Sequence, residues 1–242
     1  MEQIKKVFLA ILLFALIASL GCNKSTKQND NNSKGKTYNK KVSEITDKYG
    51  NKYKTTTIGT QIWMAENLNI EHYRNGDSIP QVLDKDKWAE LKSGAWCYYF
   101  HDSINGKIFG KLYNWYAVND PRGLAPEGWH IPSDIEWTQL TDYLGGESVA
   151  GGKMKDTIFW KSPNTAATDE SGFKSLPGGA RLFLGSFNFG CIDSIGEYGC
   201  FWSSTKDYDH FAWYRNLYYS NSIVVRSNLW MEDGLSVRCV KD

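Results

Sequence analysis

The residue whose neighbours point most directly to a chemical reaction is Cys22. Lys5 and Lys6 precede an unbroken apolar run over residues 7–20, and Gly21 comes directly before the cysteine. A positive start, a short apolar run and a small residue at the cut are typical of a secretory signal. A thiol at this junction can be acylated, so we expect export and lipidation of Cys22. The alternative is an ordinary cleaved signal peptide with an incidental cysteine.

The tract after this cysteine predicts a tether followed by one domain. Residues 23–41 are almost all Asn, Lys, Ser and Thr, a composition that cannot bury enough apolar surface to fold. We therefore expect a signal peptide at 1–21, a lipidated cysteine and flexible polar tether at 22–48, and one domain at 49–242. The lipid would hold this domain at the cell envelope, on the outer membrane or the periplasmic face.

The four remaining cysteines favour a disulfide over a metal site. An exported protein can form disulfides, and Cys191 and Cys200 flank a short segment that can fold back on itself. Cys97 and Cys239 would then pair with each other or stay reduced. No C-x-x-C spacing occurs, and no histidine lies near a cysteine in the sequence, so we expect no zinc.

The titratable residues do not form a known catalytic pattern. The chain has four histidines: His72, His101, His130 and His210. They give no H-E-x-x-H motif, and no G-x-S-x-G elbow occurs. Glycosidase chemistry needs two carboxylates across a cleft, for which Glu66, Asp169 and Glu170 are available. We expect no enzymatic activity; the alternative is an oxidative or hydrolytic enzyme, with Cys191 and Cys200 as a reactive pair.

Calcium is the one cofactor for which loop oxygens are available. This cation takes carboxylate and amide oxygens as ligands. Asn164, Asp169 and Glu170 lie in one expected loop, and Asp207 and Asp209 lie in another. Neither set matches an EF-hand, and such residues also start turns, so we expect no cofactor and keep calcium as the alternative.

Aromatic residues near the C-terminus form the best candidate for ligand binding. The candidate residues lie on an expected strand over 212–219 and in the turn after it: Trp213, Tyr214, Arg215, Asn216, Tyr218, Tyr219 and Asn221. Strand alternation places Trp213, Arg215 and Tyr219 on one face and the other strand residues opposite. One face would be core, while the other could stack on sugar rings or peptide. The alternative is that all these rings fill an aromatic core.

Four Asp-(Ser/Thr)-Ile triplets carry the hydroxyls of Ser78, Ser103, Thr157 and Ser194. These triplets resemble the acceptor sequence for O-glycosylation of exported proteins in some Gram-negative bacteria. The alternative interpretation is that Asp-Ser and Asp-Thr begin turns before strands.

The elements that must position these residues indicate an α+β domain with one antiparallel sheet, one or two helices and extensive loops. Ser133 and Glu136 form a capping box that predicts a helix ending at Gly145. The expected strands cover residues 53–58, 61–64, 94–100, 212–219, 223–227 and 235–240, and short helices are expected near 84–91 and 151–155. The net charge is +1, and scattered Lys and Arg give no basic stripe for nucleic acid.

A series of segments runs in order through this domain: Y-G-N-K-Y at 49–53, I-G-T-Q-I-W-M-A-E-N-L at 58–68, G-K-L-Y-N-W-Y-A-V at 110–118, P-E-G-W-H-I-P-S at 126–133, D-E-S-G-F at 169–173, L-P-G-G at 176–179, W-S-S-T at 202–205 and S-V-R-C-V at 236–240. Together they resemble the Fibrobacter succinogenes major paralogous domain family. That family is similar in fold to the C-type-lectin-like group, which includes the formylglycine-generating domains.

The resemblance implies a compact, loop-rich domain whose terminal strands pair, and it implies no established activity. The family usually has a cysteine before the P-x-G-W-H motif, where this chain has Ala125. Cys239 is then left to pair with Cys97 or to remain a free thiol. We expect a lipid-anchored envelope protein whose lectin-like domain binds a glycan or an envelope protein. The other alternative is a purely structural surface protein.

Overall fold

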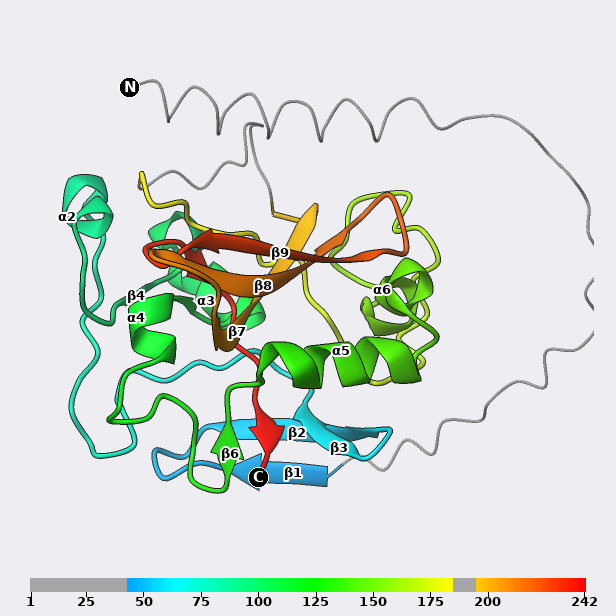
Figure 1. Ribbon diagram of the computed structural model, residues 1–242, viewed down its shortest axis with the longest axis horizontal. Helices are drawn as coiled ribbons and strands as arrows, with labels where there is room; N and C mark the ends of the chain where they lie inside the picture. Colours follow the sequence, from blue (N-terminus) through cyan, green and yellow to red (C-terminus); the bar gives the residue numbers. More distant parts are fainter. Residues whose placement is uncertain (1–42, 185–194) are drawn as a thin grey trace, which may run out of the picture. The chain divides into compact units, whose positions relative to one another are not determined.

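The computed structural model describes residues 43–184 and 195–242, shown in colour in Figure 1. The expected signal peptide and most of the tether lie outside the described residues, as do Cys22, Cys191 and Ser194. Within the two described ranges, no helix combines the length and the apolar composition needed to cross a membrane.

A five-stranded antiparallel sheet brings the two ends of the domain together. Its strands are, in spatial order, β1 (Ser43–Thr46), β2 (Lys52–Ile58), β3 (Gln61–Met64), β11 (Val240–Lys241) and β6 (Trp129–His130). The expected hairpin of β2 and β3 is confirmed, and Gly59 turns it with a φ of +64°. Val240 pairs with both Trp63 and His130, so the last strand closes against the first hairpin in the lower part of Figure 1.

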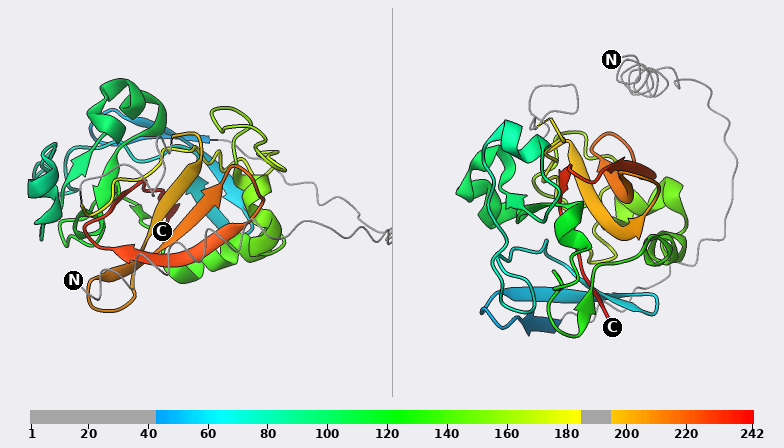
Figure 2. Two further views of the ribbon diagram at one scale, coloured as in Figure 1. Left: turned by 90° about the horizontal axis from the view of Figure 1, so that it is seen from above. Right: turned by 60° about the vertical axis from the view of Figure 1, so that its left-hand side comes forward.

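A second antiparallel sheet, of three long strands, lies at the other end of the domain in Figures 1 and 2. It consists of β7 (Tyr198–Lys206), β8 (Phe211–Tyr218) and β9 (Val224–Trp230). The hairpin of β8 and β9 confirms the strands expected there. Strand β7 was not expected, because its buried first half and polar second half show no alternation in the sequence.

A third sheet is small and combines β10 (Gly234–Leu235), β5 (Leu112–Asn114) and β4 (Trp96–Cys97). The prediction of one strand over 235–240 is wrong, because β10 and β11 are separate. Between them, the fully buried Arg238 donates hydrogen bonds to the carbonyl oxygens of Met64, Phe173 and Lys174. These partners belong to distant segments, so the chain bends to reach them instead of continuing as a strand.

Helix α5 (Asp134–Tyr143) begins at the expected capping box of Ser133 and Glu136. The prediction of one or two helices is too low, because four short helices add to it: α2 (Lys85–Ala89), α3 (Ser103–Phe109), α4 (Trp115–Val118) and α6 (Glu147–Met154). A 3-10 turn, η1, covers Tyr99–His101. Asp84, Asp102 and Asn114 cap the first three short helices through their side-chain oxygens, which compensates for their small number of turns. The domain is therefore α+β.

Aromatic side chains make up a large part of the core. The chain has ten tryptophans, all within the described residues. Eight of them are buried: Trp63, Trp88, Trp96, Trp115, Trp129, Trp137, Trp160 and Trp202. Trp213 and Trp230 are the two that stay partly exposed. Burial of large rings is the main stabilising contribution here, because each removes up to about 250 Å² from water.

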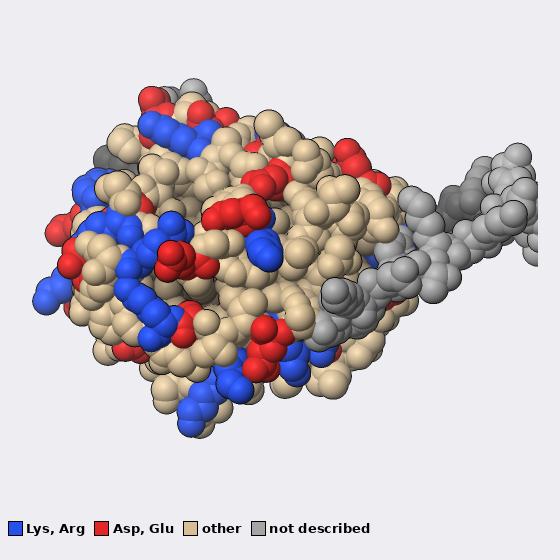
Figure 3. All heavy atoms as spheres, turned by 90° about the horizontal axis from the view of Figure 1, so that it is seen from below, with Lys and Arg blue, Asp and Glu red and all other residues tan. Residues whose placement is uncertain are grey.

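Charged side chains of both signs are interspersed on the face of the domain shown in Figure 3. Lys and Arg lie beside Asp and Glu at several places there, and uncharged residues cover much of the face. This agrees with the balanced net charge of +1.

Candidate functional site

The residues expected to bind a ligand divide between the interior and the surface. Tyr214 and Arg215 are buried, with exposed fractions of 7% and 0%. The others are partly exposed: Trp213, Asn216, Tyr218, Tyr219 and Asn221. Both faces of β8 contribute to the core, because Tyr214 packs in the cluster of Trp202 while Leu217 packs in the cluster of Leu140. The expectation of one core face and one fully displayed face therefore does not hold.

The exposed part of the β8–β9 pair carries the two tryptophans that the core leaves out. Phe211 pairs with Trp230 across the strands, and Trp213 pairs with Asn228. Directly opposite residues point to the same side of a sheet, and so do residues two apart, so these four side chains share one face. The ring centroids of Phe211 and Trp230 are 4.4 Å apart.

Two further rings extend this contact into a line. Tyr208, in the turn before β8, lies 5.0 Å from Phe211, and Phe183 lies 5.3 Å from Trp230, measured between ring centroids. Tyr208 is 54% exposed and the other three are partly exposed. We call Phe183, Trp230, Phe211 and Tyr208 the aromatic row. It presents several apolar surfaces in succession to solvent.

Polar groups lie beside the aromatic row. Asn228 donates from Nδ2 to Oδ2 of Asp207 at 2.6 Å, and this bond fixes the orientation of its amide. The imidazole of His210 lies nearly parallel to the indole of Trp230, with the ring centroids 6.4 Å apart. A carboxylate, an amide and an imidazole are therefore available for hydrogen bonds next to the rings.

An ion-pair network fixes the sheet face against helix α5. Arg215 donates to Oδ1 of Asp134 at 2.7 Å, and Arg226 donates to both oxygens of the same carboxylate. Burial lowers the pKa of Arg215. Although partial burial acts to raise the pKa of Asp134, the hydrogen bonds from Arg226 and Arg215 hold it below its ordinary value. All three groups are thus charged at neutral pH.

Several residues considered for metal or catalytic chemistry have hydrogen bonds within the fold. Within residues 43–184 and 195–242, no group of three His, Cys, Asp or Glu side chains is placed to hold a metal ion. Asp169 accepts a hydrogen bond from the backbone of Lys174, and Asn164 donates one to the carbonyl of Asp156. His130 lies between Glu136 and Asp242, at 2.8 and 2.7 Å.

The described cysteines, Cys97, Cys200 and Cys239, are free thiols, and all three are buried. The Sγ of Cys200 lies 3.6 Å from Oδ1 of Asn216, to which it can donate. Burial raises the pKa of Cys200, which disfavours the thiolate needed for nucleophilic or redox chemistry. Cys200 carries no disulfide in the structure, and Cys191 lies outside the described residues, so the Cys191–Cys200 link is not shown and stays a prediction.

The three described hydroxyls of the Asp-(Ser/Thr)-Ile triplets are on the surface. Ser78, Ser103 and Thr157 are all exposed. In two of the triplets, the aspartate accepts a hydrogen bond from the backbone of the isoleucine two residues on, at 2.8 Å to Ile104 and 2.7 Å to Ile158. One of these two bonds caps α3 and the other forms a turn, and all three described hydroxyls face solvent.

Sequence reasoning missed all four members of the aromatic row, Phe183, Tyr208, Phe211 and Trp230. The alternation of Phe211 with Trp213 was a signal for one of them. The place of Trp230 depends on the register between β8 and β9, and the sequence of either strand alone does not specify that register.

Comparison with known proteins places the domain in a family. No curated protein and no solved structure matches the chain. The family model described as the Fibrobacter succinogenes major domain matches residues 56–241, from within β2 to the end of β11. This range is more than three quarters of the chain and contains nearly all the segments that suggested the resemblance. The chain therefore belongs to the Fibrobacter succinogenes major domain family.

Proposed function

We propose that this chain is a non-enzymatic, lipid-anchored protein of the cell envelope whose C-type-lectin-like domain binds a glycan through the aromatic row. The observation that carries the proposal is the distribution of the tryptophans. The core buries eight of ten, and the two that it leaves partly exposed lie on one face of the β8–β9 pair. Exposed rings forgo the stabilisation that burial would give, so a gathered set of them marks a binding surface.

The chemistry of the row favours a sugar chain as the ligand. A pyranose ring has an apolar face of C–H groups and a rim of hydroxyls. The row offers consecutive ring surfaces with centroid spacings of 4.4 to 5.3 Å, and Asp207, Asn228 and His210 supply hydrogen-bonding groups beside them. Several rings in succession suit a ligand with several such faces, which is an oligosaccharide.

Two further observations support the cellular setting and the fold group. The apolar run before Cys22 and the polar tract after it have the pattern of an exported, acylated protein. The α+β architecture and the pairing of β11 with β3 agree with what the C-type-lectin-like group would require. Activity does not follow from fold, so the proposal rests on the aromatic row.

A panel of glycans presented to the full-length protein tests the proposal. We expect selective binding to one or a few oligosaccharides, and loss of at least tenfold in affinity in Trp230→Ala, the equivalent of about 1.4 kcal/mol. Tyr49→Ala is the matched control, because Tyr49 is 43% exposed, stacks on His72 and belongs to the turn between β1 and β2. Equal binding by both variants, or binding to an envelope protein but to no glycan, would contradict the proposal.

A further inference from the structure

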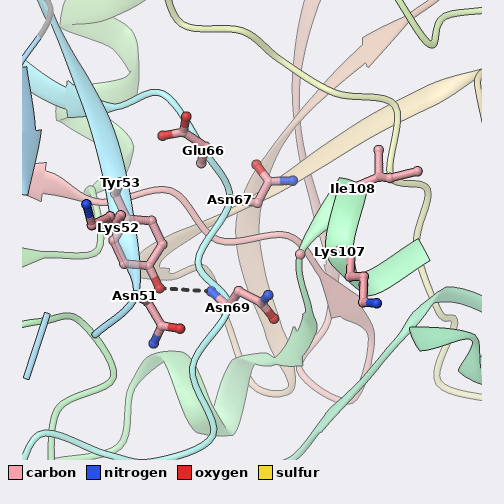
Figure 4. A pocket seen from close by; sticks show the side chains of 10 residues that line it. Asn51, Lys52, Tyr53, Glu66, Asn67, Asn69, Lys107 and Ile108 are labelled. Atoms are coloured by element: carbon pink, nitrogen blue, oxygen red, sulfur yellow. Dashed lines mark hydrogen bonds between the residues drawn. The ribbon is translucent and has the colours of Figure 1, made fainter. Parts of the chain in front are cut away.

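A small polar pocket lies between strand β2, helix α3 and the segment after β3, and it shares no residue with the aromatic row (Figure 4). Its volume is about 190 Å³, well below the roughly 300 Å³ at which sites for drug-sized ligands begin. The residues that line it are Asn51, Lys52, Tyr53, Glu66, Asn67, Asn69, Gly106, Lys107, Ile108 and Gly110.

Glycine lets the walls of this pocket come together. Gly110, directly after α3, has a φ of +76°, a conformation that other residues rarely adopt. A Cβ atom at this position would lie only 2.9 Å from the Cβ of Asn67. The end of α3 can therefore close against the segment of residues 66–69 only because residue 110 has no side chain.

Two asparagines in the walls each use one end of the side-chain amide in a hydrogen bond within the protein. The other end of each amide can bond to a ligand. The Nδ2 of Asn51 donates to Oδ2 of Asp47 at 2.8 Å, which leaves its oxygen without a bond to any described residue. Oδ1 of Asn69 accepts a 2.6 Å hydrogen bond from Lys111, which leaves its NH₂ group without a bond to any described residue. The pocket thus offers one oriented acceptor and one oriented donor.

Glu66 and Tyr53 add a second acceptor and a second donor. Oε2 of Glu66 accepts from the backbone N–H of Lys54 at 2.6 Å, and its Oε1 has no hydrogen bond to a described residue. The Tyr53 hydroxyl oxygen accepts from the N–H of Asn69 at 3.4 Å, the dashed line in Figure 4, and its own proton remains free to donate. The four groups come from two segments of the lining, residues 51–53 and residues 66–69.

Positive charge surrounds these groups. Lys52 and Lys107 lie at the rim and are exposed, and Lys52 has an ion pair with Glu44 at 3.2 Å. Behind the pocket, the fully buried Arg238 donates from Nε to Oδ1 of Asn67 at 2.6 Å. Its four hydrogen-bond acceptors among the described residues are neutral, so no carboxylate of the described residues is in direct contact with its charge. Glu66 is the one carboxylate in the lining.

We propose that this pocket binds a single sugar unit that carries a carboxylate, a hexuronic acid. The volume suits one pyranose, and the alternating acceptors and donors suit hydroxyl groups, each of which can donate and accept. Lys107, which has no ion pair with a described residue, is the group that would meet the sugar carboxylate. This proposal is independent of the function proposed above. The pocket and the aromatic row share no residue, so substitutions can test the two sites separately.

Calorimetric titration of the full-length protein with glucuronate, galacturonate and glucose tests the proposal. We expect at least one uronate to bind more tightly than glucose. Lys107→Gln should weaken uronate binding about tenfold, as for loss of one charge-assisted hydrogen bond, and leave the weaker glucose binding unchanged. Lys85→Gln, the same charge change on the exposed first residue of α2, is the matched control. Glu66→Gln keeps the shape and should weaken all three sugars.

Three results would overturn the proposal. The first is the absence of binding by every sugar to a wild-type protein that melts cooperatively. The second is an equal loss of affinity in Lys107→Gln and Lys85→Gln, which would mean non-specific charge attraction. The third is uronate binding that survives Glu66→Gln unchanged but disappears in Trp230→Ala, because the uronate would then lie on the aromatic row.

Discussion

The guanidinium of Arg226 lies over the indole of Trp213, 3.5 Å from the ring centroid. Asp134 holds the guanidinium there through both of its oxygens, and the same carboxylate binds the fully buried Arg215. One residue at the start of α5 thus orders the surface ring and neutralises a buried charge. These contacts hold Trp213 and Arg226 in place, and ordering of side chains before binding reduces the entropy lost when a ligand binds.

Asp134→Asn should destabilise the domain by about 3 kcal/mol, because it leaves the buried Arg215 without a counterion. Asp86→Asn, also in the first turn of a helix but exposed, should change stability by less than about 0.5 kcal/mol. Urea denaturation of the two variants and the wild type measures the difference. An equal effect of the two substitutions would show that Arg215 does not depend on Asp134.

The stability that Asp134 contributes through these ion pairs should be lost at acidic pH. The folded pKa of Asp134 lies below its ordinary value, so its contribution to stability is present above the pKa of the unfolded state, near 4. It is lost as the pH falls through the folded pKa. The stability gap between wild type and Asp134→Asn should therefore narrow below pH 4, and a gap that stays constant to pH 2 would contradict the assignment.

The contribution of His130 to the stability of the fold should also depend on pH, and it should be lost on raising the pH rather than on lowering it. Partial burial acts to lower its pKa, but the hydrogen bonds to Asp242 and Glu136 outweigh burial and raise it. Its contribution is then fully present below the unfolded pKa, near 6.5, and is lost as the pH rises through the folded pKa. We expect His130→Gln to melt roughly 2 °C lower than wild type at pH 5.5, and at the same temperature as wild type at pH 8.5. An equal difference in melting temperature between His130→Gln and wild type at pH 5.5 and at pH 8.5 would contradict this assignment.

The buried thiols predict slow chemical modification. Cys97 and Cys239 are 0% exposed, and burial raises the pKa of each to about 12. Iodoacetamide should therefore leave both unmodified in the native protein and alkylate both after unfolding without reductant. Peptide mapping by mass spectrometry measures this, and a linked Cys97–Cys239 peptide would contradict it. The same map reads out the expected Cys191–Cys200 link.

Export and modification are tested by mass spectrometry of the membrane fraction from the native host. We expect a fragment that begins at acylated Cys22, and its loss from the membrane fraction in Cys22→Ser. Added mass on peptides with Ser78, Ser103 or Thr157 would support glycosylation, because all three hydroxyls are exposed. An intact mass equal to polypeptide plus lipid alone would end the glycosylation hypothesis.

Local signals predicted the local parts of the fold. The Ser133–Glu136 capping box and the Gly59 hairpin turn each depend on a few neighbouring residues, and both formed as expected. Non-local partners decided the rest. The break between β10 and β11 follows from acceptors for Arg238 on distant segments. The burial of Tyr214 and Arg215 follows from packing on both faces of β8, which one strand's sequence does not contain.

Non-local contacts also limited what the sequence could predict about the candidate site. Trp213, which shares the sheet face of the row but is not part of it, was identified from its own strand. Trp230 and Phe183 are members of the row through strand register and loop packing. The polar pocket was not expected, because Asn51, Asn69 and Gly110 come from three separate segments. The signal in the sequence was that Asn51, Glu66 and Gly110 lie in the segments that carried the family resemblance.

The central claim is that the aromatic row binds an oligosaccharide. The most direct test takes a glycan that binds and measures the affinity of the full-length protein for oligosaccharides of it with increasing numbers of sugar units. A row of four rings predicts that affinity rises by about fivefold per sugar unit, near 1 kcal/mol per ring contact, up to about four units and then levels off. Trp230→Ala should remove most of this rise, while Tyr49→Ala should keep it. Equal affinity for one unit and for four, or an unchanged rise in Trp230→Ala, would contradict the claim.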